Sequence, residues 1–213
     1  MIIIYSINFF FTPVKTKDCN FQHIPVFLEK LFEFPYHKSN HSKEDIMLKI
    51  IISPAKKMNI ENDLFGPRSI PQFLNDTQRL MDYLKGLSPS DLKTLWNCND
   101  QILQLNLDRL AHMDLSQNLS PAILTYEGLQ YQAMAPKIFE QHQWDYIETH
   151  LFILSGFYGL IRPFDGVVPY RLEMGARLKT DLCKDLYDFW GNHLYRRLVG
   201  EKSSADDETI IVN

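Results

Sequence analysis

Short apolar runs along the chain have the composition of buried β-strands. Residues 49–52 and 210–212 are rich in isoleucine, and residues 151–154 are apolar at every position. β-Branched side chains favour extended backbone, and strands that are covered on both faces show continuous apolar runs. Residues 122–126 have the same character. The pattern therefore predicts four strands, separated by long stretches of chain, and a sheet at the centre of the fold.

After the first of these runs, apolar residues return at three- and four-residue spacing, which indicates amphipathic helices. One helix is predicted from near Pro71 to Gly86, where glycine takes the position of a C-terminal cap. Another begins at Ser88, whose hydroxyl suits an N-cap, with Pro89 in the first turn and Asp91 favourable beside the helix dipole. The two helices should form a tight αα-hairpin.

Two further helices are predicted from the same spacing. Residues 100–112 carry leucine at helical intervals, and on this helix Asn106 and Arg109 could face outward. Residues 182–198 are expected to form one continuous helix with its apolar residues on or near one face. Helices and strands that alternate along the chain are typical of a mixed α/β fold, in which helices flank a sheet.

Polar side chains follow the apolar run that ends at Leu154. The chain turns tightly at Gly156 and then reaches Tyr158, Arg162 and Asp165. Ligand sites in open α/β sheets lie at the carboxyl ends of strands, and glycine lets the backbone approach a ligand closely. Two interpretations stay open: a cleft that binds a ligand, or a turn whose tyrosine and charged side chains only brace a loop.

Further charged residues extend this candidate cleft. Tyr170, Arg171 and Glu173 follow in a stretch bounded by proline and glycine, and Lys56 and Lys57 lie just beyond the first predicted strand. A lysine in that position can neutralise a phosphate as a point charge. The alternative is a pair of solvated lysines that hold no ligand.

Composition and charge limit the classes of partner. The 213 residues are 45% apolar and 23% charged, which is ordinary for a soluble globular protein, and the net charge is −4. Nucleic-acid binding would therefore need a local basic surface. Cys19, Cys98 and Cys183 are too few and too far apart for a disulfide framework or a zinc site, which favours reduced thiols in the cytoplasm.

The first 46 residues differ from the rest. Residues 1–11 are apolar and aromatic, but Pro13 follows and no basic residue precedes them, so that neither a membrane span nor a signal peptide is predicted. His23, His37 and His41 are spaced too loosely for a metal site. No metal or cofactor is expected.

Four sequence blocks, in a fixed order, resemble the YaaA family of bacterial peroxide-stress proteins. The blocks are Ile52-Ser53-Pro54-Ala55-Lys56, Tyr126-x-Gly128-x-x-Tyr131, residues 154–162 with 169–175, and Lys184-Asp185-Leu186-Tyr187-x-Phe189-Trp190. The resemblance implies a YaaA-type fold for residues 47–213. It makes residues 1–46 an atypical extension, which a misassigned translation start would explain.

The resemblance implies a function as well: a cytoplasmic peroxide-stress protein that binds double-stranded DNA through sequence-independent backbone contacts. In the family this role is associated with limiting oxidative DNA damage and lowering free intracellular iron. A family member would continue past residues 210–212 with a basic C-terminal part. We therefore expect that this part is missing and that residues 210–212 form an exposed sheet edge. Neither a membrane nor a protein partner is predicted.

The αα-hairpin around residues 85–88 resembles the helix-hairpin-helix that is attributed to this family for DNA binding. Free amides at the N-terminus of the second helix could hold a phosphate without reading bases. The usual hairpin has Gly-apolar-Gly, whereas Ser88 takes the place of the second glycine here, and Asp91 would repel a nearby phosphate. A plain αα-hairpin, which many folds contain, is the alternative.

We therefore predict a surface that binds the DNA backbone, formed by Lys56, Lys57, Lys85, Gly86, Ser88, Arg162 and Arg171. The alternative is an enzyme of unknown reaction that acts on a phosphate-bearing ligand. In that case Lys56, Arg162 and Arg171 hold the anion, and Tyr170 or Glu173 serves as acid or base. Steep salt dependence would distinguish binding of a DNA backbone from a small, saturable enzyme site.

Overall fold

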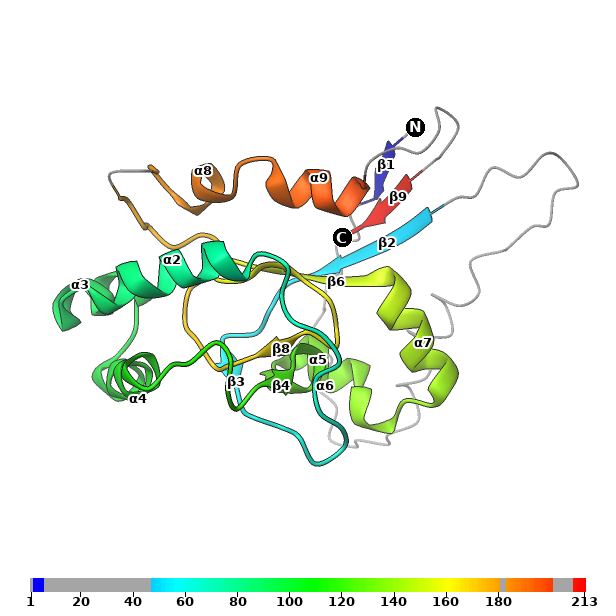
Figure 1. Ribbon diagram of the computed structural model, residues 1–213, viewed down its shortest axis with the longest axis horizontal. Helices are drawn as coiled ribbons and strands as arrows, with labels where there is room; N and C mark the ends of the chain where they lie inside the picture. Colours follow the sequence, from blue (N-terminus) through cyan, green and yellow to red (C-terminus); the bar gives the residue numbers. More distant parts are fainter. Residues whose placement is uncertain (1, 6–46, 181–182, 201–208) are drawn as a thin grey trace, which may run out of the picture.

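The computed structural model describes residues 2–5, 47–180, 183–200 and 209–213. These residues form a mixed α/β fold around a five-stranded sheet with the strand order β1-β9-β2-β6-β7 (Figure 1). The strands are β1 (Ile2–Tyr5), β2 (Met47–Ile52), β6 (Leu151–Ser155), β7 (Gly159–Ile161) and β9 (Thr209–Val212). Neighbouring strands are parallel, except that β7 is antiparallel to β6. The predicted fold class is confirmed.

Three of the predicted strands are present as β2, β6 and β9. The expectation of an exposed edge at residues 210–212 is wrong, because β9 lies between β1 and β2. Ile210 pairs with Ile3 on one side and with Leu48 on the other. Among the described strands, β1 takes the outer position, so that the N-terminal segment supplies a pairing partner for β9.

The fourth predicted strand, at residues 122–126, is wrong. Its first four residues form a helical turn, α5 (Ala122–Thr125), which the Thr125 hydroxyl closes by donating to the Pro121 carbonyl at 2.8 Å. Only the end of the run is extended, in the short strand β5 (Tyr126–Glu127). All four residues of α5 are buried. Full burial makes a helical turn as uniformly apolar as a buried strand, so that periodicity cannot separate them.

The predicted αα-hairpin is formed by α2 (Leu74–Lys85) and α3 (Pro89–Trp96). Ser88 is the N-cap of α3, and its hydroxyl accepts a hydrogen bond from the Asp91 amide at 3.2 Å. Gly86 is the C-cap of α2, as predicted, but its φ of −82° is right-handed. The end of α2 therefore does not depend on the left-handed conformation that glycine permits.

The outward placement of Asn106 and Arg109 on α4 (Asp100–Ala111) is wrong. Asn106 is buried, and its amide donates to the Ile102 carbonyl at 2.7 Å. Arg109 is half-buried and donates to the Met58 carbonyl at 2.9 Å. Helix α4 packs against both α2 and α3, so that it buries more of its circumference than a single leucine stripe indicates.

The single helix predicted at residues 182–198 is two helices, α8 (Leu186–Trp190) and α9 (His193–Val199). Gly191 separates them with a positive φ of 50°, a conformation that ends a helix and that glycine adopts readily. Residue 182 lies outside the described residues.

The remaining elements are short strands and helices that connect the sheet to the hairpin. Two small antiparallel pairs join β3 to β5 and β4 to β8. These elements are β3 (Lys57–Met58), β4 (Ser120–Pro121), β8 (Gly166–Val167), α6 (Leu129–Met134), the 3-10 helix η1 (Pro136–Ile138) and α7 (Gln141–His150).

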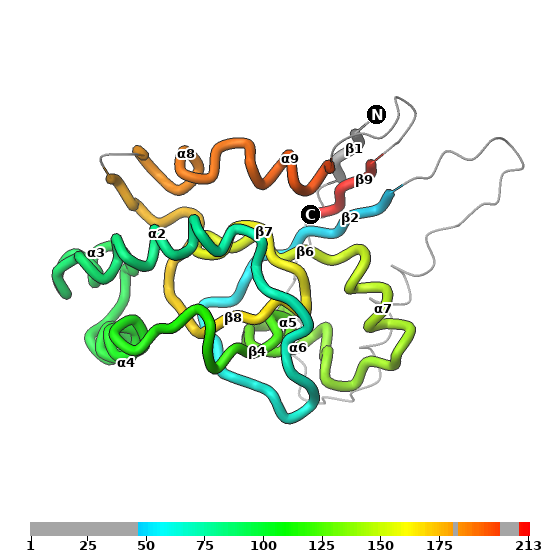
Figure 2. Tube along the Cα trace, in the orientation of Figure 1, coloured from blue at the N-terminus to red at the C-terminus, as the bar shows by residue number. Residues whose placement is uncertain are grey.

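The sheet directs two strand ends toward the hairpin. In Figure 1 the carboxyl ends of β2 and β6 point to the side of the molecule on which α2, α3 and α4 lie. The chain between β8 and α8 returns past α2 on the same side (Figure 2), and the Tyr83 hydroxyl of α2 donates to the Lys179 carbonyl of this returning segment at 2.9 Å. This is the strand end at which ligand sites of open α/β sheets lie.

Several expectations concern residues that the structure describes only in part. Cys98 is half-buried and Cys183 is buried, and both are free. Cys19 and the three histidines at positions 23, 37 and 41 lie outside the described residues. None of the helices in the described part of the chain has the length and apolar character that a membrane span requires. The same part of the chain contains no group of three His, Cys, Asp or Glu side chains that could hold a metal ion.

Candidate anion-binding cleft

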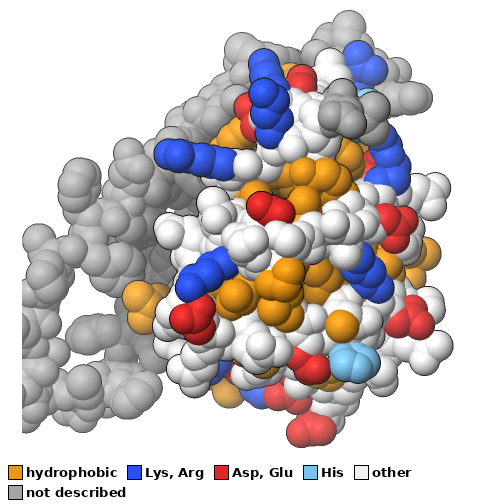
Figure 3. All heavy atoms as spheres, turned by 90° about the vertical axis from the view of Figure 1, so that its left-hand side faces the viewer, with side chains coloured by type: hydrophobic (Ala, Val, Ile, Leu, Met, Phe, Trp, Pro, Cys, Tyr) orange, Lys and Arg blue, Asp and Glu red, His pale blue; other side chains and the backbone are white. Residues whose placement is uncertain are grey.

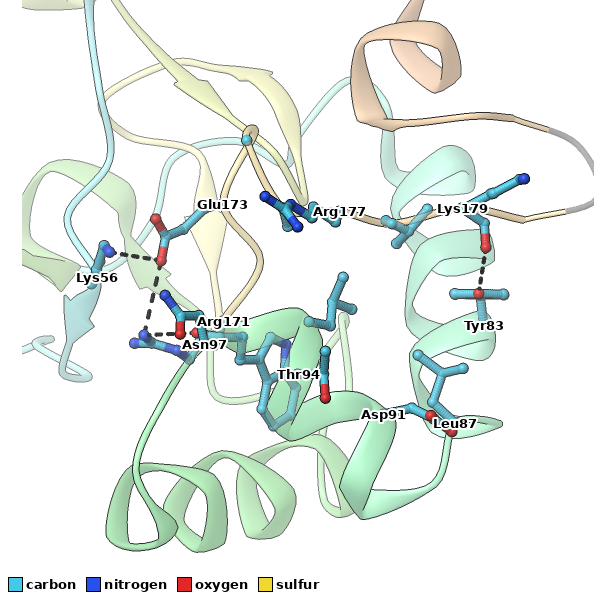
Figure 4. A pocket seen from close by; sticks show the side chains of 15 residues that line it. Lys56, Tyr83, Leu87, Asp91, Thr94, Asn97, Arg171, Glu173, Arg177 and Lys179 are labelled. Carbon is cyan, nitrogen blue, oxygen red and sulfur yellow. Dashed lines mark hydrogen bonds and ion pairs between the residues drawn. The ribbon is translucent and has the colours of Figure 1, made fainter.

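A cleft of about 810 Å³ lies between the α2–α3 hairpin and the segment formed by residues 169–179, which we call the return segment. Its volume is within the range of small-molecule sites. Figure 4 shows Lys56, Arg171 and Glu173 gathered at one end of the cleft, with Tyr83 and Lys179 at the other. The two walls differ in chemistry, because the hairpin contributes mainly apolar side chains and the return segment mainly charged ones.

The apolar wall consists of the inner faces of the two hairpin helices. Tyr83 and Leu87 come from α2 and the residues after it, and Leu95 and Trp96 come from the last turn of α3. The helical period that places Leu92 and Trp96 in the core leaves Leu95 half-buried at the edge of the cleft. The apolar wall therefore follows from the same amphipathic pattern that forms the hairpin.

The charged wall follows from an alternation of side chains along the return segment. Tyr170 and Leu172 are buried, at 6% and 3% exposure, whereas Arg171 and Glu173 line the cleft. Extended backbone sends successive side chains to opposite faces, so that Arg171 and Glu173 face the cleft. Gly156 holds the segment close, because a Cβ there would lie 2.7 Å from the Met174 amide nitrogen.

Glu173 is the centre of the charged end of the cleft. Its Oε1 lies 2.9 Å from the Lys56 ammonium and 3.8 Å from Arg171 Nη2 (Figure 4). Arg171 Nη2 also donates to the Trp96 carbonyl at 3.2 Å, which ties the charged wall to α3. The Arg171 side chain is only 10% exposed, whereas Glu173 is 45% exposed and Lys56 is 65% exposed.

The cleft has an excess of positive charge and of unused donors. Four cationic side chains line it against two carboxylates, and within the described residues neither Arg177 nor Lys179 has a carboxylate partner. Two buried nitrogens of the lining, Arg171 Nε and Trp96 Nε1, have no hydrogen-bond acceptor in the described part of the chain. Buried donors are paired in most proteins, so that each of these two calls for an explanation.

Three of the residues that the sequence predicts come together here: Lys56, Arg171 and Glu173. Arg162 does not. It lies on the other side of the turn, where its Nη2 is 3.3 Å from Asp165 and its amide donates to the same carboxylate at 2.9 Å. Asp165 is 1% exposed and also accepts from the Ser69 hydroxyl at 2.6 Å. The Arg162–Asp165 pair therefore braces the turn and does not line the cleft.

The two predicted lysines outside the cleft are engaged elsewhere. Lys57 lies in β3, with its ammonium 2.5 Å from Glu127, and this contact and the Asn59 amide hold the pKa of the Glu127 carboxyl below its usual range. Lys85 donates to the Met113 carbonyl at 3.2 Å, beyond the C-terminus of α4. Neither side chain lines the cleft, although Lys57 directly follows Lys56 in the sequence.

Tyr170, the other predicted acid or base, is buried behind the charged wall. Its hydroxyl lies 2.6 Å from Ser155 Oγ and 2.9 Å from the Tyr126 hydroxyl. Burial raises the pKa of Tyr170 to about 12 and raises the pKa of Tyr126 well above its ordinary value. Tyr158 is buried as well and accepts from the Val168 amide at 3.0 Å. These tyrosines fix the turn from the inside, so that Glu173 is the predicted acid or base that faces the cleft.

The hairpin turn offers few free donors. The Gly86 amide donates to the Asp82 and Tyr83 carbonyls, and the Leu87 amide donates to the Leu84 carbonyl. At the start of α3, the Asp91 carboxylate accepts from the Ser88 hydroxyl at 2.6 Å, which places a negative charge at the position where a phosphate would bind. The turn itself therefore presents a carboxylate and few free amides to a ligand.

Sequence reasoning did not identify Arg177 and Lys179 as site residues. The alternation that places Arg171 and Glu173 on the cleft side ends at the turn of residues 174–176, and all of residues 175–179 line the cleft, so that no sequence pattern singles out these two cations. Nothing in the sequence shows that the Trp96 indole nitrogen is buried without an acceptor among the described residues.

Comparison with known proteins gives a consistent match. Residues 48–213 match the family model described as "Peroxide stress protein YaaA". The chain is 55% identical over 157 residues to a UPF0246 protein of Desulfitobacterium hafniense, covering 74% of this chain and 62% of the relative. It is 52% identical over 158 residues to a UPF0246 protein of Pediococcus pentosaceus, covering 74% and 63%. The chain thus spans less than two thirds of the length of these relatives.

Proposed function

The chain belongs to the family of the peroxide stress protein YaaA, and on that basis we propose that it acts in the peroxide stress response by binding double-stranded DNA. Binding occurs through sequence-independent contacts to the DNA backbone in the cytoplasm. In this role the protein limits oxidative damage to DNA and lowers free intracellular iron, as the family resemblance implies. The phosphates are held by the charged wall of the cleft and not by the hairpin turn.

The observation that supports this proposal is a pair of cations on the return segment, Arg177 and Lys179, which have no carboxylate partner among the described residues. A DNA backbone requires cationic side chains that are free to approach phosphates, and it does not require base recognition. Figure 3 shows Lys and Arg side chains bordering exposed apolar surface on the face that includes the hairpin side of the molecule, with carboxylates among them. The overall charge of −4 makes such a local surface necessary.

A salt titration of duplex binding tests the proposal. We expect the logarithm of the binding constant of the full chain to fall linearly with the logarithm of salt concentration, equally for unrelated sequences. Arg177→Glu and Lys179→Glu should each weaken binding for every sequence, and neutralising one contact should lower the slope by about one. Lys85→Glu is the matched control, because Lys85 lies outside the cleft, and it should leave the slope unchanged. Binding that ignores salt, or equal losses in all three variants, would contradict the proposal.

A second candidate function is an enzyme that acts on a phosphate-bearing ligand. The observation that favours it is the position of Glu173, a half-exposed carboxylate between two cations inside a concave site. Such a carboxylate can transfer a proton to or from a ligand whose anion is held by Lys56 and Arg171. Glu173→Gln should then abolish turnover of a phosphate-bearing substrate without weakening its binding. Full turnover in Glu173→Gln would remove Glu173 from a catalytic role.

A further inference from the structure

We infer that the cleft is a binding site for a single nucleotide. Its phosphate takes the place of the Glu173 carboxylate on Lys56 and Arg171, and its base lies against the apolar wall of Leu87, Leu95 and Trp96. This inference rests on the proposed function, because it uses the same cleft. It goes further by naming the ligand that binds inside the cleft, whereas the backbone phosphates of a DNA duplex contact the charged residues at its rim.

The anion position is marked by the contacts of Glu173. One carboxylate oxygen is shared by the Lys56 ammonium at 2.9 Å and by Arg171 Nη2 at 3.8 Å, so that an anion is stabilised at this point. Both Lys56 and Glu173 are largely solvated, and exposed ion pairs of this kind contribute little to stability. A phosphate monoester carries a larger negative charge and three acceptor oxygens, so that it can displace the carboxylate.

Arg171 has an unused capacity that suits a phosphate. Its Nη2 donates to the Trp96 carbonyl, while its Nε is buried and has no acceptor in the described part of the chain. Arginine binds phosphate best with two parallel N–H donors, and the 3.8 Å contact to Glu173 falls short of that geometry. The Nε atom is closed off from solvent, so that an anion reaches it only if the guanidinium turns toward the cleft.

The apolar wall supplies the second half of a nucleotide site. Leu87 and Leu95 are half-buried and form an apolar surface against which a planar base can pack, and Trp96 lines the cleft beside them with only 4% of its surface exposed. Asn97 lies beside Arg171 in Figure 4 and presents an amide at the junction of the two halves, where a ribose hydroxyl would lie. A site for inorganic phosphate alone would need neither this wall nor a volume of about 810 Å³.

The test is calorimetric titration of the full chain with adenosine monophosphate, adenosine and inorganic phosphate. We expect adenosine monophosphate to bind at least tenfold more tightly than either fragment, because only the nucleotide uses both walls. Arg171→Lys keeps the charge but loses the paired donors, and it should weaken nucleotide binding at least tenfold. Glu173→Gln should strengthen binding several-fold by removing the competing carboxylate.

Two neighbouring lysines provide a matched control. Lys56→Gln should weaken nucleotide binding, whereas Lys57→Gln should leave it unchanged, because Lys57 faces Glu127 and not the cleft. Thermal unfolding of each variant shows whether the fold is retained, and if Arg171→Lys does not fold, the two lysine variants carry the test. Inorganic phosphate that binds as tightly as the nucleotide, or equal effects of the two lysine variants, would overturn the inference.

A competition experiment identifies the source of the nucleotide and tests the inference separately from the proposed function. Displacement of adenosine monophosphate by a single strand with a 5′-phosphate, but not by the same strand without it, would identify the terminal nucleotide of a DNA strand as a ligand. If neither strand displaces it, the ligand is a free nucleotide. Duplex binding without any nucleotide binding would overturn this inference and leave the proposed function standing. Nucleotide binding without salt-dependent duplex binding would overturn the proposed function and leave this inference standing.

Discussion

The hairpin turn and the return segment are both predicted to bind anions, and they differ in the donors that the fold leaves free. In the hairpin, the Gly86 and Leu87 amides donate to carbonyls of α2, and the Asp91 carboxylate occupies the start of α3. In the return segment, Arg177 and Lys179 have no carboxylate partner within the described residues, and the Arg171 Nε donor is unused. An anion site requires donors that the fold has left free, and a motif with the right shape does not guarantee them.

The difference comes from how each region satisfies its polar groups. A helical hairpin closes its own hydrogen bonds between residues three or four positions apart, so that its turn is nearly complete without a ligand. The return segment is extended up to Glu173, where Tyr170 and Leu172 are buried in the core, and it then turns at residues 174–176. Its charged side chains reach the cleft and have few partners among the described residues. The same extended backbone therefore places Tyr170 and Leu172 in the core and Arg171 and Glu173 in the cleft.

The largest effect is expected from the contact that holds the return segment in place. In Gly156→Ala the new Cβ would lie 2.7 Å from the Met174 amide nitrogen and 2.8 Å from the Glu173 carbonyl carbon. Backbone cannot yield as a flexible side chain does, so that we expect a loss of about 1–3 kcal/mol in the free energy of unfolding and weaker DNA binding. Chemical denaturation measures the first and a duplex titration the second.

Gly66→Ala is the control for this substitution, because nothing lies within 4 Å of a Cβ at Gly66. It should change neither stability nor binding. If Gly156→Ala lowered the free energy of unfolding no more than Gly66→Ala, the close contact between Gly156 and the return segment would not hold this segment in place. The return segment would then differ less from the hairpin, which closes its own hydrogen bonds.

The stability that buried Tyr170 gives to the return segment should decrease at alkaline pH. Tyr170 keeps its proton in the folded protein because its pKa is raised to about 12, whereas an unfolded tyrosine ionises near pH 10. The folded state then binds more protons than the unfolded state, so that stability falls as the pH rises from about 10 to about 12. Thermal unfolding over this range should show the decline, and Tyr170→Phe should make it shallower. An unchanged slope in Tyr170→Phe would mean that Tyr170 ionises as an exposed residue does.

A smaller effect is expected in the hairpin. Ser88→Ala removes the hydroxyl that caps α3 and should lower the free energy of unfolding by about 1 kcal/mol, and Ser88→Gly should cost only a few tenths. Neither variant should alter the affinity for duplex DNA, because the turn offers few free donors and the Asp91 carboxylate lies at the start of α3. A loss of DNA affinity in Ser88→Ala that exceeds its loss of stability would return the phosphate site to the hairpin.

The smallest effect concerns the two adjacent lysines. Lys57→Gln removes an exposed ion pair and should change stability by no more than about 1 kcal/mol. The pKa of Glu127 should rise toward its ordinary value, because the Lys57 contact is the main cause of its depression. A carboxyl titration followed by NMR measures this shift. Lys56→Gln should leave Glu127 unaffected, and a shift of Glu127 in that variant would show that the two lysines share one environment.

Much of the site could be predicted from sequence alone, because it depends on local order. Lys56 could be predicted because it lies just beyond a buried strand, and Arg171 and Glu173 because they lie in a stretch bounded by proline and glycine; the αα-hairpin follows from its leucine spacing and the Ser88 cap. Arg162 was assigned to the same cluster on equal grounds, yet it pairs with Asp165 on the far side of the turn. The positions of Arg162 and Arg171 in the sequence do not show which of the two lines the cleft.

By itself, the sequence determined the features that arise from neighbouring residues: the apolar runs of β2, β6 and β9, the αα-hairpin, and the blocks that identify the family. Only the tertiary structure decided that β9 lies between β1 and β2, and that Arg171, Arg177 and Lys179 share one cleft with an apolar wall. Only the tertiary structure also left two buried donors of that cleft without an acceptor among the residues that it describes. The physical reason is that strand pairing and free donors depend on which distant segments meet, and local propensity does not contain that information.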